Sequence, residues 1–237
     1  SNREELRELI SSHPVDLVVT IAYGTLIKQE LLNLPKFGWM NIHFSKLPRF
    51  RGAAPVQRAI LEGVSDSGIS FFKLDVGMDT GPVYEMLDVE ILPEDTTPSL
   101  LERMSKIAAD RLPALLDEIA NGKSPVEQRG VGASHAGKFS KEDGRLVPSL
   151  TVEEFSAKVR ALSDNPGTFL SFRGAQLGVA SVQNPSEVVE VQPIGTLTAT
   201  KKSLFLQLSN GHIELVTVVP QGKKAMSGAD FARGARL

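Results

Sequence analysis

The sequence contains no cysteine among its 237 residues, which excludes disulfide bonds, thiolate metal sites and cysteine nucleophiles. No stretch approaches the roughly 20 consecutive apolar residues that a membrane-spanning helix requires. Internal repeats, low-complexity tracts and the patterns of signal and transit peptides are also absent from the sequence. Histidine is scarce and scattered, which gives no indication of a metal cluster. The four histidines are His13, His43, His135 and His212.

What is present is the composition of an ordinary globular protein. Hydrophobic residues make up 41% of the chain and charged residues 23%, and a chain of this length buries a core in one or two domains. The net charge of −2 conceals an asymmetry, because residues 1–122 are acidic on balance and residues 123–237 are basic. A basic second half suits a polyanionic partner, although a solvated basic surface is the simpler interpretation. The sequence starts at Ser1 without an initiator methionine, so we expect a processed start or a fragment.

The first half of the chain alternates predicted strands with predicted helices, the pattern of an α/β fold with a parallel sheet. The run 16–22 is almost continuously apolar, which predicts a strand buried on both faces. The predicted strands cover residues 16–22, 38–45, 69–75 and 83–91, and the predicted helices cover residues 2–12, 28–34, 54–63 and 97–120. The last helix has a long apolar stripe and ends at Asn121-Gly122.

The second half of the chain changes character after that helix. Glycines and scattered charges without periodicity predict a linker over residues 123–141. Thr151 and Glu154 then form the pattern of a capping box at the start of a helix. Five short strand-like runs follow, at the spacing of a small barrel or sandwich. They cover residues 168–173, 176–183, 194–200, 203–208 and 212–219. We therefore predict a first domain over residues 1–122 and a second over residues 142–237.

The strand predicted over residues 38–45 carries an unusual set of polar residues at its end. Successive side chains of a strand point to opposite faces, so Asn41, His43 and Ser45 share one face. An amide, an imidazole and a hydroxyl together, just before Pro48 stops the strand, indicate a reaction centre. In open α/β sheets ligands bind beyond the carboxyl ends of the strands. A buried structural histidine is the alternative interpretation of His43.

A second candidate is Asp79, which lies between Gly77 and Gly81 in the loop after the predicted strand 69–75. The sequence Asp-Thr-Gly is typical of an ordinary turn. The same loop is suited to deliver a carboxylate to His43, because an imidazole that works as acid or base needs a partner that fixes its tautomer. An aspartic protease is disfavoured, because that chemistry needs two carboxylates that share a proton and the motif occurs once here.

These motifs resemble those of the 10-formyltetrahydrofolate-dependent formyltransferases. The segments Asn41-Ile42-His43, Ser45-Lys46-Leu47-Pro48 and Asp79-Thr80-Gly81 match the strand end, the proline loop and the Asp-Thr-Gly loop of that family's active site. Two further segments resemble the branch of the family that acts on initiator methionyl-tRNA. They are the run from Arg51 to Arg58 and the run from Val219 to Met226, which is similar to a Pro-x-Gly-Lys-Lys-x-Met signature. The resemblance covers essentially the whole chain.

The resemblance implies an α/β, Rossmann-like formyltransferase domain, incomplete at its N-terminus, followed by a small OB-like β-barrel domain. It also implies formyl transfer from 10-formyltetrahydrofolate, a co-substrate, to the α-amino group of methionyl-tRNA, by a monomer that needs no metal. The implied catalytic residues are Asn41, His43 and Asp79, with a protonated His43 and the Asn41 amide stabilising the oxyanion. The implied folate-binding residues are Ser45, Lys46, Leu47, Pro48, Tyr23 and Gly24, and the candidate tRNA contacts are Lys201, Lys202, Lys223 and Lys224.

Two departures from the family pattern accompany the resemblance. Phe44 follows His43 where the family usually has glycine, and the strand alternation turns this side chain away from the site. Family members also carry an N-terminal stretch ahead of the position at which this sequence starts. Other functions therefore stay open: a formyltetrahydrofolate hydrolase, an amino-sugar formyltransferase, or a truncated fragment that binds without turnover. The compartment is equally open between the bacterial cytoplasm, the mitochondrion and the plastid.

Overall fold

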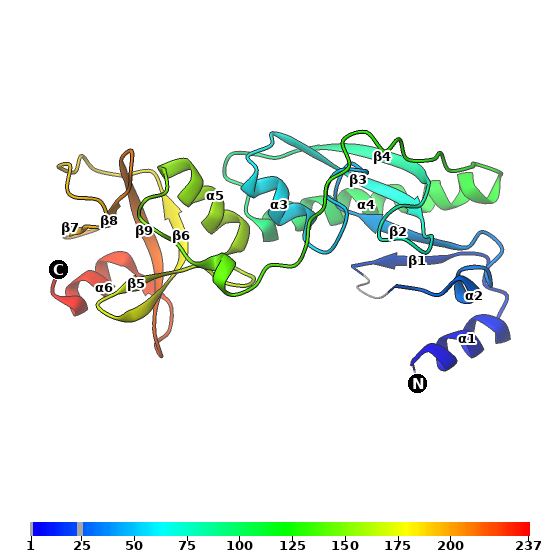
Figure 1. The fold of residues 1–237 in the computed structure, drawn as a ribbon, viewed down its shortest axis with the longest axis horizontal. Coiled ribbons are helices and arrows are strands. Elements are labelled where there is room, and N and C mark those ends of the chain that lie inside the picture. Colours follow the sequence, from blue (N-terminus) through cyan, green and yellow to red (C-terminus); the bar gives the residue numbers. More distant parts are fainter. Residues whose placement is uncertain (1, 23–25) are drawn as a thin grey trace. The chain divides into compact units, whose positions relative to one another are not determined.

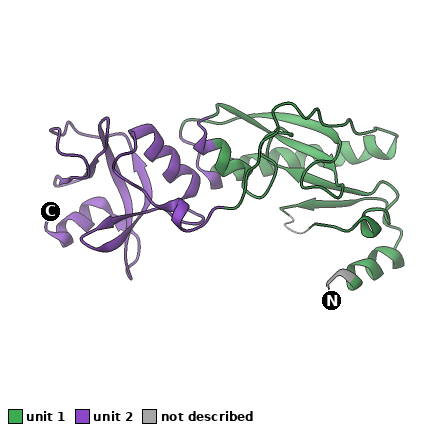
Figure 2. Ribbon diagram, viewed as in Figure 1, with its two compact units in different colours: residues 1–59, 64–93, 99–138 green, residues 60–63, 94–98, 139–237 purple. Residues whose placement is uncertain are grey.

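The computed structural model describes residues 2–22 and 26–237. Tyr23 and Gly24, two of the predicted folate-binding residues, therefore lie outside the described residues. The chain divides into two compact units (Figure 2). The first comprises residues 1–59, 64–93 and 99–138, and the second comprises residues 60–63, 94–98 and 139–237. No helix in the described part of the chain is long and apolar enough to cross a membrane.

The first unit is built on a four-stranded sheet (Figure 1). The strands are β1 (Val18–Ile21), β2 (Trp39–His43), β3 (Asp66–Lys73) and β4 (Val83–Glu90), and they lie side by side in this order. The helices that precede, separate and follow them are α1 (Asn2–Ser12), α2 (Gln29–Leu32), α3 (Pro55–Leu61) and α4 (Thr97–Ala120). The predicted elements of this half are thus confirmed, and α1 and α4 begin and end at the predicted residues.

The parallel sheet that the alternation predicts is only partly present. β1 pairs with β2 in parallel, whereas β2, β3 and β4 pair with one another antiparallel. The loop 74–82 that joins β3 to β4 is too short for the crossover that a parallel pair requires. The connection from β2 to β3 contains α3 and is long enough for either direction, so its sequence pattern did not distinguish them.

The prediction that the first strand is buried on both faces is wrong. Val19 of β1 is 36% exposed and Ile21 is 50% exposed. β1 lies at one end of the strand order, with β2 as its neighbour in the described sheet. Every residue of β2, which lies between β1 and β3, is buried. The strand that carries the candidate catalytic residues is therefore enclosed within the unit.

The start of β2 is anchored by Trp39, the single tryptophan of the chain. Its indole Nε1 donates a hydrogen bond of 2.8 Å to the carbonyl of Leu31 in α2. A buried indole N–H needs such a partner, and the residue is 2% exposed. Around it lies a small apolar cluster that also includes Ile10 of α1 and Leu32 of α2. The two short N-terminal helices are thereby packed against the base of the strand that carries His43.

The segment after α4 does not behave as the linker that its sequence predicts. Val126 exchanges two backbone hydrogen bonds of 2.8 Å with Val83 of β4. Further along, the backbone of Ala136 donates to Arg51 and accepts from Ala54. These pairings place the chain up to residue 138 in the first unit. Backbone pairing of this kind needs no hydrophobic periodicity, so no residue pattern in the segment signals it.

The second unit is a curled antiparallel sheet against which helices pack. It contains η1 (Glu142–Gly144), α5 (Val152–Leu162), β5 (Phe169–Phe172), β6 (Ala175–Gln183), β7 (Leu197–Ala199), β8 (Leu204–Gln207), β9 (His212–Pro220), β10 (Met226–Ser227) and α6 (Gly228–Ala235). The strands lie in the order β5-β6-β9-β8-β7, and β10 pairs with β9. The five predicted strands are confirmed, and so is the capping box of Thr151 and Glu154 at the start of α5.

The sequence did not predict β10 and α6. The stretch from Gly228 onward looks too glycine-rich for a helix, since glycine disfavours helix interiors. Its helix begins at a cap instead, because the Ser227 hydroxyl accepts a hydrogen bond from the Asp230 backbone amide. Gly228 is required there, because a Cβ atom at this position would lie 2.1 Å from the carbonyl oxygen of Leu215 in β9. The glycine permits α6 to pack directly onto the sheet.

Candidate active site

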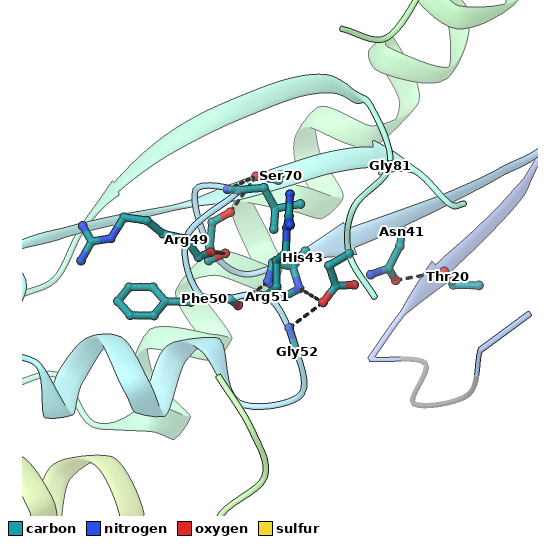
Figure 3. Close-up of polar contacts among 12 residues, drawn as sticks. Thr20, Asn41, His43, Arg49, Phe50, Arg51, Gly52, Ser70 and Gly81 are labelled. Carbon is teal, nitrogen blue, oxygen red and sulfur yellow. Dashed lines mark hydrogen bonds and ion pairs between the residues drawn. The ribbon is translucent and has the colours of Figure 1, made fainter. Parts of the chain in front are cut away.

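His43 lies at the end of β2 and is 6% exposed. Its Nε2 is 2.9 Å from the carbonyl oxygen of Phe50 (Figure 3). A carbonyl oxygen only accepts hydrogen bonds, so Nε2 carries the proton and donates it. The other ring nitrogen, Nδ1, is 3.7 Å from Oδ2 of Asp79. The geometry therefore makes Nδ1 the nitrogen that gains and loses a proton, and Phe50 fixes the tautomer.

The Phe50 carbonyl is held in place by an unusual backbone conformation. Phe50 has a φ of 57°, in the left-handed region that a bulky residue rarely adopts, and it is 2% exposed. Its backbone N–H donates a 2.9 Å hydrogen bond to the hydroxyl of Ser134. The guanidinium of Arg49 lies 4.7 Å from the centre of its ring. Burial and the Ser134 bond together orient the carbonyl that receives the His43 proton.

The loop between β2 and Phe50 is held by hydrogen bonds from two serine hydroxyls. The Ser45 hydroxyl donates to the Arg49 carbonyl at 2.6 Å. The Ser70 hydroxyl donates to the Ser45 carbonyl at 2.7 Å and accepts from the Leu47 amide at 3.1 Å. The peptide bond between Leu47 and Pro48 is cis. These bonds within the chain define the path of the loop beside His43 (Figure 3).

Asp79 reaches the imidazole from the loop between β3 and β4. It also has a positive φ, of 53°, and its Oδ2 accepts a 2.7 Å hydrogen bond from the backbone N–H of Gly52. The loop is closed by Asp75, whose Oδ1 accepts from the Gly77 amide at 2.9 Å and from the Thr80 hydroxyl at 2.7 Å. The sequence predicted that this loop brings a carboxylate to His43, and the structure places the two side chains together.

Asn41 is oriented by a residue that the sequence reasoning missed. Thr20 of β1 lies opposite Asn41 in the parallel pair, and its hydroxyl donates a 2.9 Å hydrogen bond to Asn41 Oδ1 (Figure 3). Because Oδ1 is engaged by this donor, the amide group Nδ2 is turned to the other side as a hydrogen-bond donor. The signal in the sequence was the single polar residue in the apolar run 17–22.

Burial dominates the proton affinity of His43. Desolvation lowers the pKa of His43 below its usual value, while the charge of Asp79 and the hydrogen bond to Phe50 act in the opposite direction. Burial disfavours the charged form of an imidazole, so the resting imidazole is neutral at pH 7. This differs from the sequence-based expectation of a protonated His43. It suits a group that first accepts a proton and then returns it.

The side chains of the predicted folate loop differ in their exposure and in their partners. Lys46 is paired with two carboxylates, Asp66 at 2.6 Å and Asp88 at 2.7 Å, and hydrogen bonds to both raise the pKa of the lysine. Ser45 and Leu47 are buried, whereas Pro48 is half-buried. Among these four residues, the half-buried Lys46 and Pro48 thus offer the accessible side-chain surface, and the Lys46 ammonium is already paired.

The four lysines predicted to contact tRNA lie in two turns of the second unit, and all are exposed. Lys201 and Lys202 follow β7, and Lys223 and Lys224 follow β9. β8 runs antiparallel to β9 with Phe205 opposite Glu214, so the turn before β8 lies toward the end at which β9 finishes. The turn between β5 and β6 belongs to the same end, because Leu177 of β6 pairs with Pro220. That turn contributes the exposed Arg173, which the sequence reasoning did not single out.

No group of three or more histidine, aspartate or glutamate side chains within residues 2–22 and 26–237 is placed to hold a metal ion. The polar groups around His43 are backbone amides, carbonyls, hydroxyls and one carboxylate. Such a set can donate hydrogen bonds to an oxyanion and transfer protons.

Comparison with known proteins places the chain in a family. The formyl transferase family model matches residues 1–116, and the model of the formyl transferase C-terminal domain matches residues 138–236. A methionyl-tRNA formyltransferase of Thermobifida fusca is 40% identical over 238 aligned residues, which include 99% of this chain and 74% of that protein.

Solved structures share the fold of the chain. The methionyl-tRNA formyltransferase from Clostridium thermocellum aligns with a TM-score of 0.62 and 23% identity, over 73% of this chain and 75% of its own. HypX from Aquifex aeolicus, in complex with tetrahydrofolic acid, aligns with a TM-score of 0.76 and 16% identity, over 96% of this chain and 40% of its own. With two matching family models and relatives of this similarity, the chain belongs to the formyl transferase family, within its methionyl-tRNA formyltransferase branch.

Proposed function

We propose that the chain transfers the formyl group of 10-formyltetrahydrofolate to the α-amino group of initiator methionyl-tRNA. One observation carries the proposal. His43 lies at the end of the strand that also holds Asn41, its tautomer is set by the Phe50 carbonyl, and its Nδ1 is 3.7 Å from Oδ2 of Asp79. The relatives named methionyl-tRNA formyltransferase support the tRNA substrate, and the HypX structure with tetrahydrofolic acid supports a folate co-substrate.

In the first step the α-amine attacks the formyl carbon. The new carbon–nitrogen bond pushes an electron pair onto the formyl oxygen, and the proton of the amine passes to Nδ1 of His43. The resting imidazole is suited to accept it, because burial keeps it neutral. The Nδ2 group of Asn41 donates a hydrogen bond to the oxyanion. Loss of one such donor typically costs about 10²–10³ in rate.

In the second step the tetrahedral intermediate collapses. The electron pair on the oxyanion re-forms the carbonyl double bond, and the bond from the formyl carbon to N10 breaks with its electron pair leaving on N10. The proton on Nδ1 passes to that nitrogen, so His43 returns to its neutral form. Between the two steps the imidazolium carries a positive charge 3.7 Å from the Asp79 carboxylate. That carboxylate, itself fixed by Gly52, stabilises the charge while it exists.

Substrate recognition is divided between the two units. For folate we propose contacts from the Pro48 ring and the surrounding backbone, since Lys46 is neutralised by two aspartates. For tRNA we propose the basic end of the second unit, where Lys201 and Lys223 lie with their neighbouring lysines, together with Arg173. Basic side chains at turns supply the phosphate contacts that dominate nucleic-acid affinity.

The test is an assay with 10-formyltetrahydrofolate in which three acceptors compete: methionyl-tRNA, an amino sugar nucleotide and water. We expect formylmethionyl-tRNA as the product, and its loss in His43→Gln, a variant of similar size. Exposed His13 provides the matched control, since His13→Gln should retain the parental rate. Formate release without formylmethionyl-tRNA would indicate a hydrolase, and a formylated sugar would indicate an amino-sugar formyltransferase. Binding of tRNA without turnover would indicate a binding fragment.

A further inference from the structure

The segment 126–136, here called the strap, follows α4 in the chain and runs past the candidate active site. At its start Val126 pairs with Val83 beside the Asp79 loop. At its other end the Ser134 carbonyl accepts from the Arg51 amide at 2.9 Å, and the Ser134 amide donates to the Pro48 carbonyl at 3.2 Å. The strap is therefore attached to both loops that approach His43, although its sequence predicts a linker.

Gln128 attaches the strap to the Asp79 loop. Its Nε2 donates to the backbone carbonyls of Asp79 at 2.9 Å and Gly81 at 2.7 Å, and its Oε1 accepts from Arg51 Nη2 at 2.6 Å. The amide orientation is unambiguous, because a guanidinium only donates and carbonyls only accept. Both amide protons are thus used to hold the two carbonyls that flank Thr80.

The two hydrogen bonds from Gln128 act on a part of the loop with an uncommon backbone conformation. Asp79 has a positive φ of 53°, in the left-handed region that residues other than glycine adopt infrequently, aspartate and asparagine more often than the rest. Gly81 approaches the backbone so closely that a Cβ atom would lie 1.8 Å from the carbonyl oxygen of Lys73. By fixing the carbonyls of Asp79 and Gly81, Gln128 sets the direction in which the Asp79 carboxylate leaves the loop.

Ser134, at the other end of the strap, contacts the backbone of Phe50, which is bonded to His43. Its hydroxyl accepts the Phe50 N–H at 2.9 Å, and the Phe50 carbonyl accepts the His43 proton at 2.9 Å. The backbone N–H and C=O of Phe50 thus connect the Ser134 hydroxyl of the strap to the imidazole of His43. Phe50 and Arg51 lie together beside His43 (Figure 3).

We infer that the strap is a positioning element of the active site. Gln128 sets Asp79 and Ser134 sets the Phe50 carbonyl, so one segment aligns both members of the His43–Asp79 pair. Neither strap side chain is bonded to His43 or to the Asp79 carboxylate in the contacts described. Both are therefore positioning residues rather than catalytic ones, and the catalytic consequence rests on the proposed function.

The first experiment compares Gln128→Met with Glu127→Met in formyl transfer to methionyl-tRNA. The two variants receive the same side chain at adjacent positions, but Glu127 is exposed whereas Gln128 is half-buried against the Asp79 loop. We expect Gln128→Met to lose up to about 100-fold in kcat, the cost that misplacement by about an ångström can produce, with KM for tRNA little changed. Glu127→Met should keep the parental kcat.

A second experiment does not depend on catalysis. The pKa of His43 is measured by NMR titration in the parent, in Gln128→Met, in Asp79→Asn and in the double variant. If Gln128 acts through the Asp79 charge, its replacement lowers the pKa of His43 in the parent and has no effect in the Asp79→Asn background, where that charge is absent. An equal shift in both backgrounds, or no shift in either, overturns the inference for Gln128.

Ser134 gives an independent test of the histidine side. Ser134→Ala removes the acceptor of the Phe50 N–H but retains the backbone bonds of residue 134, and Ser134→Thr restores a hydroxyl. We expect the Ala variant to lose kcat and to show faster exchange of the His43 Nε2 proton, and the Thr variant to recover both. Parental kcat and a parental exchange rate of the His43 Nε2 proton in folded Ser134→Ala overturn this half of the inference.

If even the parent transfers no formyl group, the proposed function fails. The two NMR measurements still decide whether the strap positions the His43–Asp79 pair.

Discussion

Replacement of Asp79 by asparagine isolates the charge that faces His43. Asparagine has nearly the same shape, and its Oδ1 can still accept the 2.7 Å hydrogen bond from the Gly52 amide. What disappears is the negative charge 3.7 Å from Nδ1. Because that charge raises the pKa of His43 against the lowering effect of burial, its removal must lower the pKa further.

The size of the effect follows from the distance. Opposite charges about 4 Å apart interact by roughly 1 kcal/mol in water and roughly 4 kcal/mol near a protein surface. Since about 1.4 kcal/mol corresponds to one pKa unit, we expect the pKa of His43 in Asp79→Asn to fall by about 1 to 3. The acidic limb of the pH profile of kcat/KM should shift to lower pH together with the pKa of His43, because that limb reports the pKa of the base in the free enzyme. The plateau should also fall, because the imidazolium intermediate loses its partner.

The measurement is an NMR titration of His43, assigned by comparison with His43→Gln, alongside the pH profile of formyl transfer. Asp110→Asn makes the same change of charge at an exposed position of α4 and should leave the pKa of His43 within about 0.2 of the parent, because solvent screens distant charges. An unchanged or higher pKa of His43 in Asp79→Asn would refute the assignment of Asp79 as the stabilising carboxylate.

Three further predictions concern other parts of the molecule. Thr20→Val removes the hydroxyl that orients Asn41 and should lower kcat by up to about 10²-fold while KM stays parental; a parental kcat would contradict the orientation. Lys223→Glu with Lys224→Glu should raise KM for tRNA and reduce the slope of log affinity against log salt by about 2, measured by tRNA binding between low and moderate salt. Glu214 has a pKa below its usual value, because the raising effect of burial is outweighed by hydrogen bonds from Gln183, Ser186 and Ser203. Its contribution to the free energy of unfolding is therefore present above its unfolded pKa and is lost as the pH falls through its folded pKa. In denaturant titrations, the free energy of unfolding should decline less between neutral and acidic pH in Glu214→Gln than in the parent.

The sequence by itself determined the parts of the fold that rest on local patterns. The apolar stripe and end signals of α4 and the capping box of Thr151 and Glu154 predicted those helices, because capping and helical periodicity involve residues within a few positions of one another. Strand alternation also placed Asn41 and His43 on one face, and the glycines around Asp79 indicated a loop that carries a carboxylate.

Only the tertiary structure decided what surrounds those residues. The tautomer of His43 depends on a backbone carbonyl, that of Phe50, and the Asp79 loop depends on Gln128, which lies 49 positions away in the chain. Backbone groups are identical at every residue, so no sequence pattern marks the one that receives a particular proton. The direction of strand pairing and the exposure of β1 were likewise decided by which segments meet in space. Contacts between distant segments are selected by the whole packing of the chain, and local residue patterns do not encode them.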